Sequence, residues 1–409
     1  MTAPAYTSGP RGASHYLPPA PLQRRWRDVL RIWWREIDKL LLLLIGLLMA
    51  VGIVAVAAAS PASADQLSTA KERVGDFMFF RRHIVFQMMG LALMIGLSFL
   101  SRDSARRLGI LVGAIMLALL FVVPVIGEEK NGAKRWINVG MSLQPSEFLK
   151  PGFAIICAWI LSWRLRDPGL PVVLYVSGLM ALIAALLMLQ PNLGDAILFG
   201  GIWLVMVLLA GMPWQRLVAL GGVVVGGLTL AYIFYDNARH RIDGFLGGGT
   251  AFDQVDLAQR TITAGGWTGT GLWLGIRKMN LPEAHTDYIF SVIGEEFGLI
   301  TCALIVLLYC ALVLRVLVRL VGEDNLFALL AATGLITQFG GQAFINMLVN
   351  LKLFPSKGMT LPLISYGGSS TLAVCFTLGL LLAITRRNPF LAREGGTLRD
   401  LIERKDAPA

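Results

Sequence analysis

The sequence predicts an all-α membrane protein with ten transmembrane helices, and three observations support this fold class. Of its 409 residues, 56% are hydrophobic and only 15% are charged. The mean hydropathy is +0.66, whereas a soluble chain of this length needs far more polar residues to cover its surface. Apolar runs of about 20 residues, the length that crosses a bilayer, recur along the chain. The composition excludes disorder for most of the chain, and the few cysteines exclude a disulfide-stapled fold.

The apolar runs place the ten helices at residues 40–60, 84–100, 108–126, 148–163, 171–189, 195–212, 216–235, 287–318, 325–349 and 369–385. An even number of spans puts both termini on the same side of the membrane. Lys and Arg favour the cytoplasmic side in short loops. Two short loops carry five arginines, which predict cytoplasmic termini: Arg102, Arg106, Arg107, Arg164 and Arg166.

Two tails flank the membrane domain, which covers residues 40–387. Residues 1–21 are rich in Pro, Gly, Ser and Ala, which predicts a disordered segment, and 388–409 form a short charged tail. Residues 22–39 predict an amphipathic helix with an aromatic face (Trp26, Leu30, Trp33, Ile37) and a basic face (Arg24, Arg27, Arg31, Arg35). Such a helix suits the anionic lipids of the cytoplasmic leaflet, or serves as a topology signal. The net charge of +10 indicates charge beside a membrane, not a nucleic-acid site.

Polar residues concentrate in four segments, all external in the predicted topology: 128–152, 189–196, 236–286 and 350–370. Polar groups at membrane depth are costly, so they usually have a structural or functional reason to be there. In the first segment, four charged residues fall at the external edge of the fourth helix: Lys134, Arg135, Glu147 and Lys150. They could bind a ligand, or Glu147 could pair with a neighbouring base and only close the helix end.

The second and third segments contain turns shaped by glycine and proline. In LQPNLGDA, Gln190, Asn192 and Asp195 are expected to satisfy backbone groups, and a substrate contact is the alternative. The external loop 236–286 is longer than a compact bundle needs, which indicates a function. Its GGWTGTG stretch lacks the flanking strand and GKS pattern of a phosphate loop, so its glycines are expected to allow a tight re-entrant or surface-packed path.

The motif PEAHTD, where this loop meets the eighth helix, brings Glu283, His285 and Asp287 within five residues. A carboxylate at the mouth of an apolar bundle is partly desolvated, which can raise its pKa and fit it to act as a base. Asp287 could instead cap the eighth helix, and the metal signature of His285 and Asp287 is weak. Deeper in the same helix, Glu295 and Glu296 are expected to be ion-paired or packed inside the bundle.

The fourth segment, NLKLFPSKGMTLPLISYGGSS, combines two charges, Lys352 and Lys357, with several glycines and prolines. Its apolar residues predict a broken loop that dips into the bilayer, where irregular backbone is tolerated only against protein or a cavity. A lysine in such a loop suits an anion such as phosphate. Together, the four segments predict an external cavity for an amphiphilic, anionic ligand such as a lipid-linked phosphate compound.

The same segments resemble the signature blocks of the SEDS family (shape, elongation, division and sporulation). The blocks are KRWINVGMSLQPSEFLK, QPNLGD, LPEAHTDYIFSVIGEEFG and FPSKGMTLPLISYGGSS, and the likeness covers nearly all of residues 40–390. PEAHTDYIFSVIGEEFG and QAFINMLVNLKLFPSKG are more similar to the division members than to the elongation members of the family. The resemblance implies a glycosyltransferase that polymerises lipid II into peptidoglycan strands on the outer face of the bacterial inner membrane, at the division septum.

The resemblance also implies partners and site residues. The partners are a class B penicillin-binding protein of the FtsI type, which crosslinks the strands, and other membrane proteins of the divisome. A divalent cation, Mg²⁺ or Mn²⁺, could assist the reaction. A lipid II flippase and an elongation-type polymerase are the alternative functions. The predicted site has Asp287 as the catalytic base and a substrate- and diphosphate-binding set that consists of Lys357, Arg135, Lys150, Glu147, His285 and Lys134.

Overall fold

The computed structural model describes residues 26–68, 73–130, 133–138, 140, 142–165, 167–212, 214–234, 239, 243, 254–356 and 358–386. The chain divides into two units, Met1–Ile37 and Asp38–Ala409. The described part of the first unit is dominated by the helix α1 (Trp26–Glu36), whose arginines are exposed. This helix ends earlier than the predicted 22–39, because Asp38 begins a second helix as its N-cap residue. The tails predicted at 1–21 and 388–409 lie outside the described residues.

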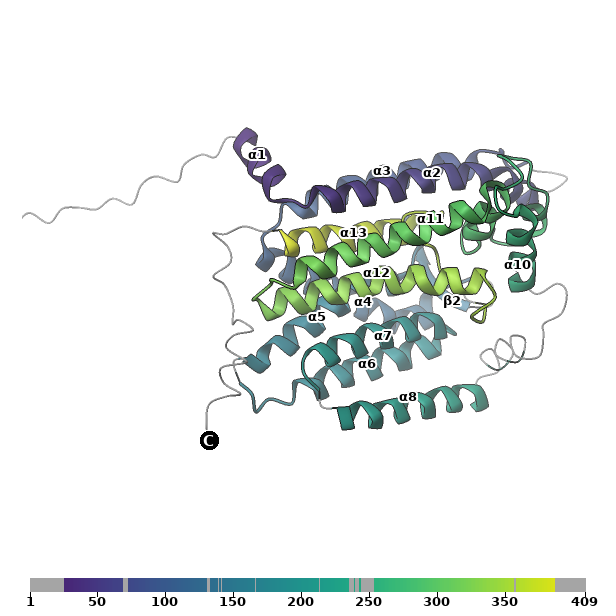
Figure 1. Ribbon diagram of the computed structural model, residues 1–409. Coiled ribbons are helices and arrows are strands. Elements are labelled where there is room, and N and C mark those ends of the chain that lie inside the picture. Colours follow the sequence, from purple (N-terminus) through teal and green to yellow (C-terminus); the bar gives the residue numbers. More distant parts are fainter. Residues whose placement is uncertain are drawn as a thin grey trace, which may run out of the picture. The chain divides into compact units, whose positions relative to one another are not determined.

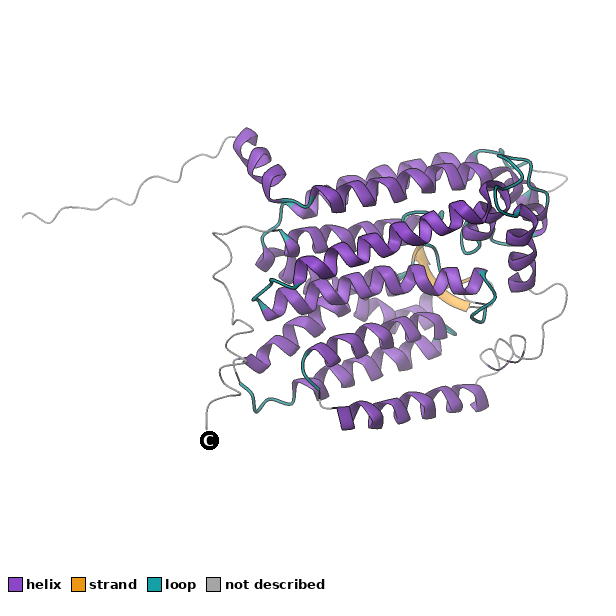
Figure 2. Cartoon of the chain, in the orientation of Figure 1, coloured by secondary structure: helices purple, strands orange, loops and turns teal. Residues whose placement is uncertain are grey.

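The second unit is a bundle of long helices (Figure 1, Figure 2). Helices coincide with all ten predicted ranges: α2 (Lys39–Leu67), α3 (Met78–Ser98), α4 (Arg102–Ile126), α5 (Pro145–Ser162), α6 (Val172–Leu189), α7 (Leu193–Leu209), α8 (Trp214–Phe234), α11 (Ile289–Leu320), α12 (Leu326–Asn350) and α13 (Gly368–Thr385). Eight of the described helices are long and apolar enough to cross a membrane, and α7 is a shorter apolar helix. The chain is therefore a multi-pass helical protein, while ten crossings and cytoplasmic termini stay predictions.

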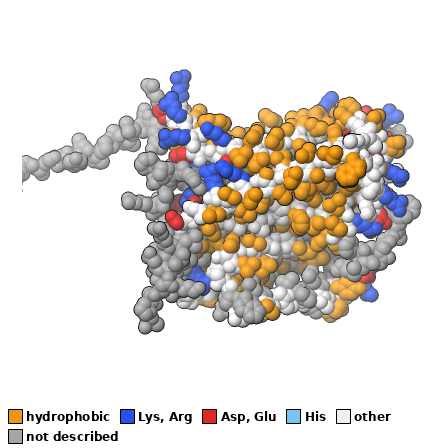
Figure 3. All heavy atoms as spheres, viewed as in Figure 1, with side chains coloured by type: hydrophobic (Ala, Val, Ile, Leu, Met, Phe, Trp, Pro, Cys, Tyr) orange, Lys and Arg blue, Asp and Glu red, His pale blue; other side chains and the backbone are white. Residues whose placement is uncertain are grey.

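Charged side chains of the bundle lie toward its two ends, and hydrophobic side chains cover the middle of the face in Figure 3. At the start of α2, the buried Asp38 carboxylate accepts hydrogen bonds from Arg315 and Arg319 of α11, each at 2.8 Å. Burial by itself raises the pKa of Asp38, but the two arginines and the Leu41 N–H outweigh it and lower the pKa overall. The ionised carboxylate thus caps α2 and ties it to α11.

Small residues let the central helices approach each other closely. A Cβ added to Gly152 of α5 would lie 2.4 Å from Cα of Gly113 in α4. The helix α13, which is almost wholly buried, packs against α3, α5 and α12. Contacts of this kind drive the association of helices in membranes, where the lipid is as apolar as the side chains. Helices α5, α12 and α13 therefore form the interior of the bundle, and the cavity described below reaches the starts of α5 and α13.

A small antiparallel sheet, which the sequence analysis did not predict, connects α4 to α5. Its strands are β1 (Glu128–Lys130), β2 (Ala133–Asn138) and β3 (Ser142–Leu143), in the order β1-β2-β3. The long loop 236–286 also contains structure, namely the helix α10 (Gln254–Gly265) and the short helix η2 (Arg277–Asn280). A further single turn, η1 (Trp163–Leu165), extends α5. The sheet, α10 and η2 lie at the end of the bundle where α3 and α5 begin, whereas η1 lies at the other end of α5.

The helix α11 is broken at Gly298, which has a left-handed backbone with φ of +81°. The GGWTGTG loop packs into this break and forms backbone hydrogen bonds with it. Thr270 N–H donates to the carbonyl of Glu295 at 2.9 Å, and Leu299 N–H donates to the carbonyl of Gly266 at 3.0 Å. The expectation that these glycines allow a tight path is confirmed. The loop supplies hydrogen-bond partners that a broken helix would otherwise lack.

The carboxylates of Glu295 and Glu296 bind the short helix η2, which follows the GGWTGTG stretch in the loop. Glu295 accepts hydrogen bonds from the backbone N–H groups of Arg277 and Lys278, at 2.6 and 2.9 Å. Glu296 forms an ion pair with Lys278 Nζ, and both side chains are almost fully buried. The prediction that these two glutamates are ion-paired or packed inside the bundle is confirmed, because Glu296 is ion-paired and Glu295 is buried with backbone partners.

We expect Gly265→Ala to destabilise the protein by about 1–3 kcal/mol, because overpacking a filled interior forces backbone shifts. A Cβ at Gly265 would lie 2.0 Å from the carbonyl oxygen of Gly294, where α10 meets α11. The matched control is Gly46→Ala in α2, where a Cβ meets nothing within 4 Å. Thermal unfolding in detergent, followed by intrinsic fluorescence, measures both variants. Equal melting temperatures for the two would show that the loop does not need this close contact.

Candidate functional site

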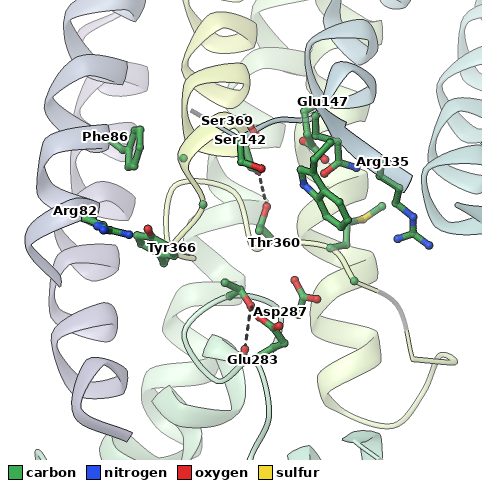
Figure 4. Close-up of a pocket in the computed structure, with 18 of the residues that line it drawn as sticks. Arg82, Phe86, Arg135, Ser142, Glu147, Glu283, Asp287, Thr360, Tyr366 and Ser369 are labelled. Carbon is green, nitrogen blue, oxygen red and sulfur yellow. Dashed lines mark hydrogen bonds between the residues drawn. The ribbon is translucent and has the colours of Figure 1, made fainter. Parts of the chain in front are cut away.

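A cavity of about 1120 Å³ lies at the end of the bundle where α3 and α5 begin. Its walls come from the start of α3, the β2–β3 region with the start of α5, the PEAHTD loop, and the loop 356–367 with the start of α13. Figure 4 shows Arg82 and Phe86 on one side, Arg135 and Glu147 on the other, and Asp287 and Glu283 from the PEAHTD loop. Three of the four polar segments singled out in the sequence thus meet in one cavity.

Asp287 lines this cavity, and its backbone is held by α12. The Asp287 carbonyl accepts hydrogen bonds from the side-chain amides of Asn346 and Asn350, at 2.8 and 3.1 Å. The N-cap residue of α11 is Tyr288, so the alternative that Asp287 caps this helix is wrong. A Cβ on Gly358 would lie 3.1 Å from Asp287 Oδ2, so the loop 356–367 passes directly beside the carboxylate.

The PEAHTD loop is a tight turn that is braced by the loop 356–367. Glu283 has a left-handed backbone with φ of +54°, and its carboxylate accepts a hydrogen bond from Thr286 Oγ1 at 2.7 Å. Ser365 Oγ donates to the carbonyl of Thr286 at 2.6 Å, and Tyr366 N–H donates to the carbonyl of His285 at 2.9 Å. Two segments about 80 residues apart therefore fix each other, and with α12 they fix Asp287.

His285 does not line the cavity, and its ring packs against the rings of Phe79 and Tyr366. The centroid of the His285 ring lies 4.1 Å from that of Phe79 and 5.4 Å from that of Tyr366. Burial lowers the pKa of His285 to about 4, against a smaller opposite effect of Glu283. The ring is therefore neutral at pH 7. A substrate contact by His285 stays a prediction, which this geometry does not favour, whereas a packing role follows from the contacts.

Acidification is expected to destabilise the wild-type protein between about pH 6.5 and pH 4 through His285. In the unfolded chain this histidine takes up a proton near its ordinary pKa, whereas the folded state keeps it neutral down to pH about 4. Its contribution to stability is thus complete above the unfolded pKa and is lost as the pH falls toward the folded pKa. We expect His285→Phe to reduce this pH dependence. An unchanged slope of melting temperature against pH would contradict the prediction.

Glu147 and Lys150 belong to a buried charge cluster that joins α5 to α7. Lys150 Nζ lies 2.7 Å from Glu147 Oε1 and 3.0 Å from Asp195 Oδ1, and the lysine side chain has no exposed surface. Asp195 also accepts hydrogen bonds from Ser146 and Asn192, at 2.7 and 2.8 Å. The alternative in which Glu147 pairs with a neighbouring base is confirmed. Glu147 lines the cavity as well, whereas Lys150 lies behind it.

Lys134 and Arg135 are consecutive residues of the strand β2, and they differ in their relation to the cavity. Arg135 lines the cavity, and its guanidinium also donates to the backbone carbonyls of Gln190, at 3.0 Å, and Pro191. The turn 189–196 thus satisfies part of its backbone through Arg135, in addition to the predicted Asn192 side chain, which accepts from Asp195 N–H. Lys134 is exposed and does not line the cavity.

Lys357 lies outside the described residues, although its neighbours Ser356 and Gly358 both line the cavity. The other lysine of that segment, Lys352, forms an ion pair with Asp256 of α10. The fourth segment is therefore tied to the long loop at one end and reaches the cavity beyond it.

Two groups of site residues were missed by the sequence analysis. Arg81 and Arg82 near the start of α3 line the cavity. A basic pair at the end of a span that is predicted to be external runs against the usual distribution of Lys and Arg, and this was the available signal. The second group is a row of buried amides on α12 that recurs every four residues and therefore shares one helix face: Gln338, Gln342, Asn346 and Asn350.

Long apolar helices, with a cavity lined by charged residues at one end of the bundle, define a multi-pass membrane protein with a candidate site for a polar ligand. Comparison with known proteins identifies its family. The family model described as "Cell cycle protein", which represents FtsW, RodA and SpoVE, matches residues 38–389, and the chain belongs to this family.

Several relatives share most of the chain. It is 36% identical over 365 residues to a protein of Caulobacter vibrioides named "Probable peptidoglycan glycosyltransferase FtsW", covering 89% of this chain and 93% of that protein. A Geobacter metallireducens protein with the same name is also 36% identical, covering 84% of this chain and 94% of that protein. The resemblance to the SEDS family, and within it to FtsW, is thereby confirmed.

Solved structures share the fold. One is described as "Structural coordination of polymerization and crosslinking by a peptidoglycan synthase complex", with a TM-score of 0.69 at 29% identity, covering 86% of this chain and 98% of that chain. Another is the rod shape determining protein RodA of Thermus thermophilus, with a TM-score of 0.63 at 28% identity and the same two coverages.

Proposed function

We propose that this chain is a peptidoglycan glycosyltransferase that polymerises lipid II on the outer face of the bacterial inner membrane during cell division. The observation that carries the proposal is Asp287, a carboxylate held by α12 in the wall of a large polar cavity. The names of the FtsW relatives support the same activity. The apolar surface of the bundle suits a substrate whose lipid part stays in the membrane while its sugars enter the cavity.

In the proposed reaction, Asp287 acts as the general base. It takes the proton from a sugar hydroxyl of the acceptor, and that oxygen attacks the anomeric carbon of the donor. The new glycosidic bond forms as the bond from that carbon to the lipid diphosphate breaks, so the electron pair leaves with the diphosphate. One displacement inverts the anomeric centre and needs a single base, unlike the carboxylate pairs of glycosidases.

The leaving diphosphate gains negative charge, which basic side chains would stabilise. Arg135 lines the cavity, and Lys357 belongs to the loop that lines it, so both are proposed to contribute. Lys150 is proposed to act indirectly, because it holds Glu147 in the cavity wall. His285 would act only as a support of the PEAHTD loop, and Lys134, which is exposed and does not line the cavity, would take no direct part in the reaction.

A divalent cation is part of the proposal. The described residues hold no cluster of three or more metal-ligating His, Cys, Asp or Glu side chains. Mg²⁺ is often bound by one or two carboxylates together with substrate phosphates. Glu283 and Asp287, which line the same cavity, fit that arrangement. A cation held there would neutralise charge on the diphosphate.

A class B penicillin-binding protein is the proposed partner, because one structural relative is described as a complex that coordinates polymerisation and crosslinking. The septum is the proposed location, since the named relatives are FtsW proteins.

The test is a polymerisation assay with purified protein, labelled lipid II and Mg²⁺ or Mn²⁺. It is run with and without the partner, which is made inactive as a transpeptidase so that any strands come from this chain. Glycan strands that depend on this chain are expected. A complete lack of strands, combined with lipid II that crosses liposome membranes, would replace the polymerase with a flippase.

A further inference from the structure

We propose that Arg82, with Arg81 beside it, binds the diphosphate of a lipid-linked substrate in the cavity. The inference rests on the proposed function, because it names the group that this site would recognise. Both arginines lie near the start of α3, both are exposed, and both line the cavity. In Figure 4, the Arg82 side chain extends from α3 toward Tyr366, on the side opposite Arg135 and Glu147.

Two other basic residues of the described chain that lie in or beside the cavity wall, Lys150 and Arg135, already have protein partners. Lys150 is enclosed by two carboxylates, and Arg135 donates to two backbone carbonyls. Within the described part of the chain, by contrast, neither Arg81 nor Arg82 forms an ion pair or a side-chain hydrogen bond. Two cations in one wall of a cavity, with no carboxylate of the described chain against them, leave their charge for a ligand.

The order of side chains along α3 fits an amphiphilic ligand. Val85, about one turn beyond Arg81, lines the same cavity and is 56% exposed. Met89, a turn further along the helix, is 49% exposed. The helix therefore presents positive charge first and apolar surface next, which is the order of diphosphate and hydrocarbon in a lipid-linked substrate.

Charge within the cavity favours the same wall. Glu283 and Asp287 line the PEAHTD side, and a diphosphate placed between them without a cation would be repelled. A guanidinium offers two parallel N–H donors to phosphate oxygens, which makes arginine well suited to bind this group. The start of α3 adds to the attraction, since its N-cap residue, Phe77, supplies no side-chain acceptor and the helix dipole favours anions there.

The experiment measures ligand binding without turnover. The full-length protein in phosphatidylcholine nanodiscs is titrated with farnesyl diphosphate, farnesyl monophosphate and farnesol. We expect Arg82→Gln to weaken binding of the diphosphate by about 10- to 100-fold, the range for a lost hydrogen bond to a charged group. Binding of farnesol should not change, and Arg82→Lys should give an intermediate loss. The matched control is Arg73→Gln, an exposed arginine on the preceding segment that does not line the cavity.

Equal diphosphate affinity in the wild type, Arg82→Gln and the double variant Arg81→Gln/Arg82→Gln would overturn the inference. So would displacement of the diphosphate by phosphatidylglycerol or by the monophosphate at similar concentrations, because the arginines would then only contact lipid headgroups. The proposed function fails separately. If the wild-type protein binds diphosphate through Arg82 but makes no strands, the anion site is supported and the polymerase function is wrong. If Arg82→Gln makes strands at the normal rate, the polymerase function is supported and the anion site is wrong.

Discussion

Replacing Asp287 with asparagine is expected to lower the rate of glycan-strand synthesis by about 10²–10⁴-fold, the usual contribution of a general base. The substitution keeps the size of the side chain and removes its ability to accept a proton. Folding should be preserved, because α12 holds this position through the backbone carbonyl of Asp287, which the substitution leaves in place. The loss should therefore fall on turnover.

The measurement is the initial rate of strand formation from labelled lipid II, with the melting temperature recorded for each variant. The matched control is Asp76→Asn, since Asp76 is an exposed aspartate just before α3 that does not line the cavity. The control should retain the wild-type rate. Strand synthesis by Asp287→Asn at a comparable rate would keep the enzyme and assign the base to another residue.

The helices were predictable because each corresponds to one continuous apolar stretch of the sequence. A run of apolar residues long enough to cross a bilayer has few other stable conformations, so the predicted ranges coincide with α2–α8 and α11–α13. The ends were harder to place. The helix α3 begins at Met78 and not at residue 84, because FFRRH continues the helix although its arginines lower the local hydropathy. For that reason Arg81 and Arg82 were not predicted to lie on this helix or at the site.

The site was predictable in its segments but not in its contacts. Asp287, Arg135 and Glu147 line one cavity, as the clustering of polar residues in external segments suggested. Which helices are neighbours is not encoded in local periodicity. The pairing of Lys150 with Asp195 joins α5 to α7 across 45 positions, and it turns a predicted ligand contact into an internal ion cluster. The short strands β1–β3 were missed because they are stabilised by one another.

Removal of the Lys150 charge is expected to be the most destabilising single change near the site. Lys150→Met leaves Glu147 and Asp195 as buried carboxylates without their cation. Breaking a buried pair in this way typically costs about 3–5 kcal/mol. Lys134→Met is the matched control, because this lysine is exposed and only 16 positions earlier in the chain. The melting temperature of Lys134→Met should stay close to that of the wild type.

A triple variant separates the two roles that Lys150 could have. Lys150→Met combined with Glu147→Gln and Asp195→Asn removes all three charges together. Replacing a whole buried ion cluster is often neutral, so the triple variant should recover much of the stability that Lys150→Met loses. That recovery would establish Lys150 as the counter-ion of two carboxylates. Lys150→Met that is as stable as the wild type, but makes no glycan strands, would instead place the lysine on the substrate. Since its side chain has no exposed surface, we expect the first result.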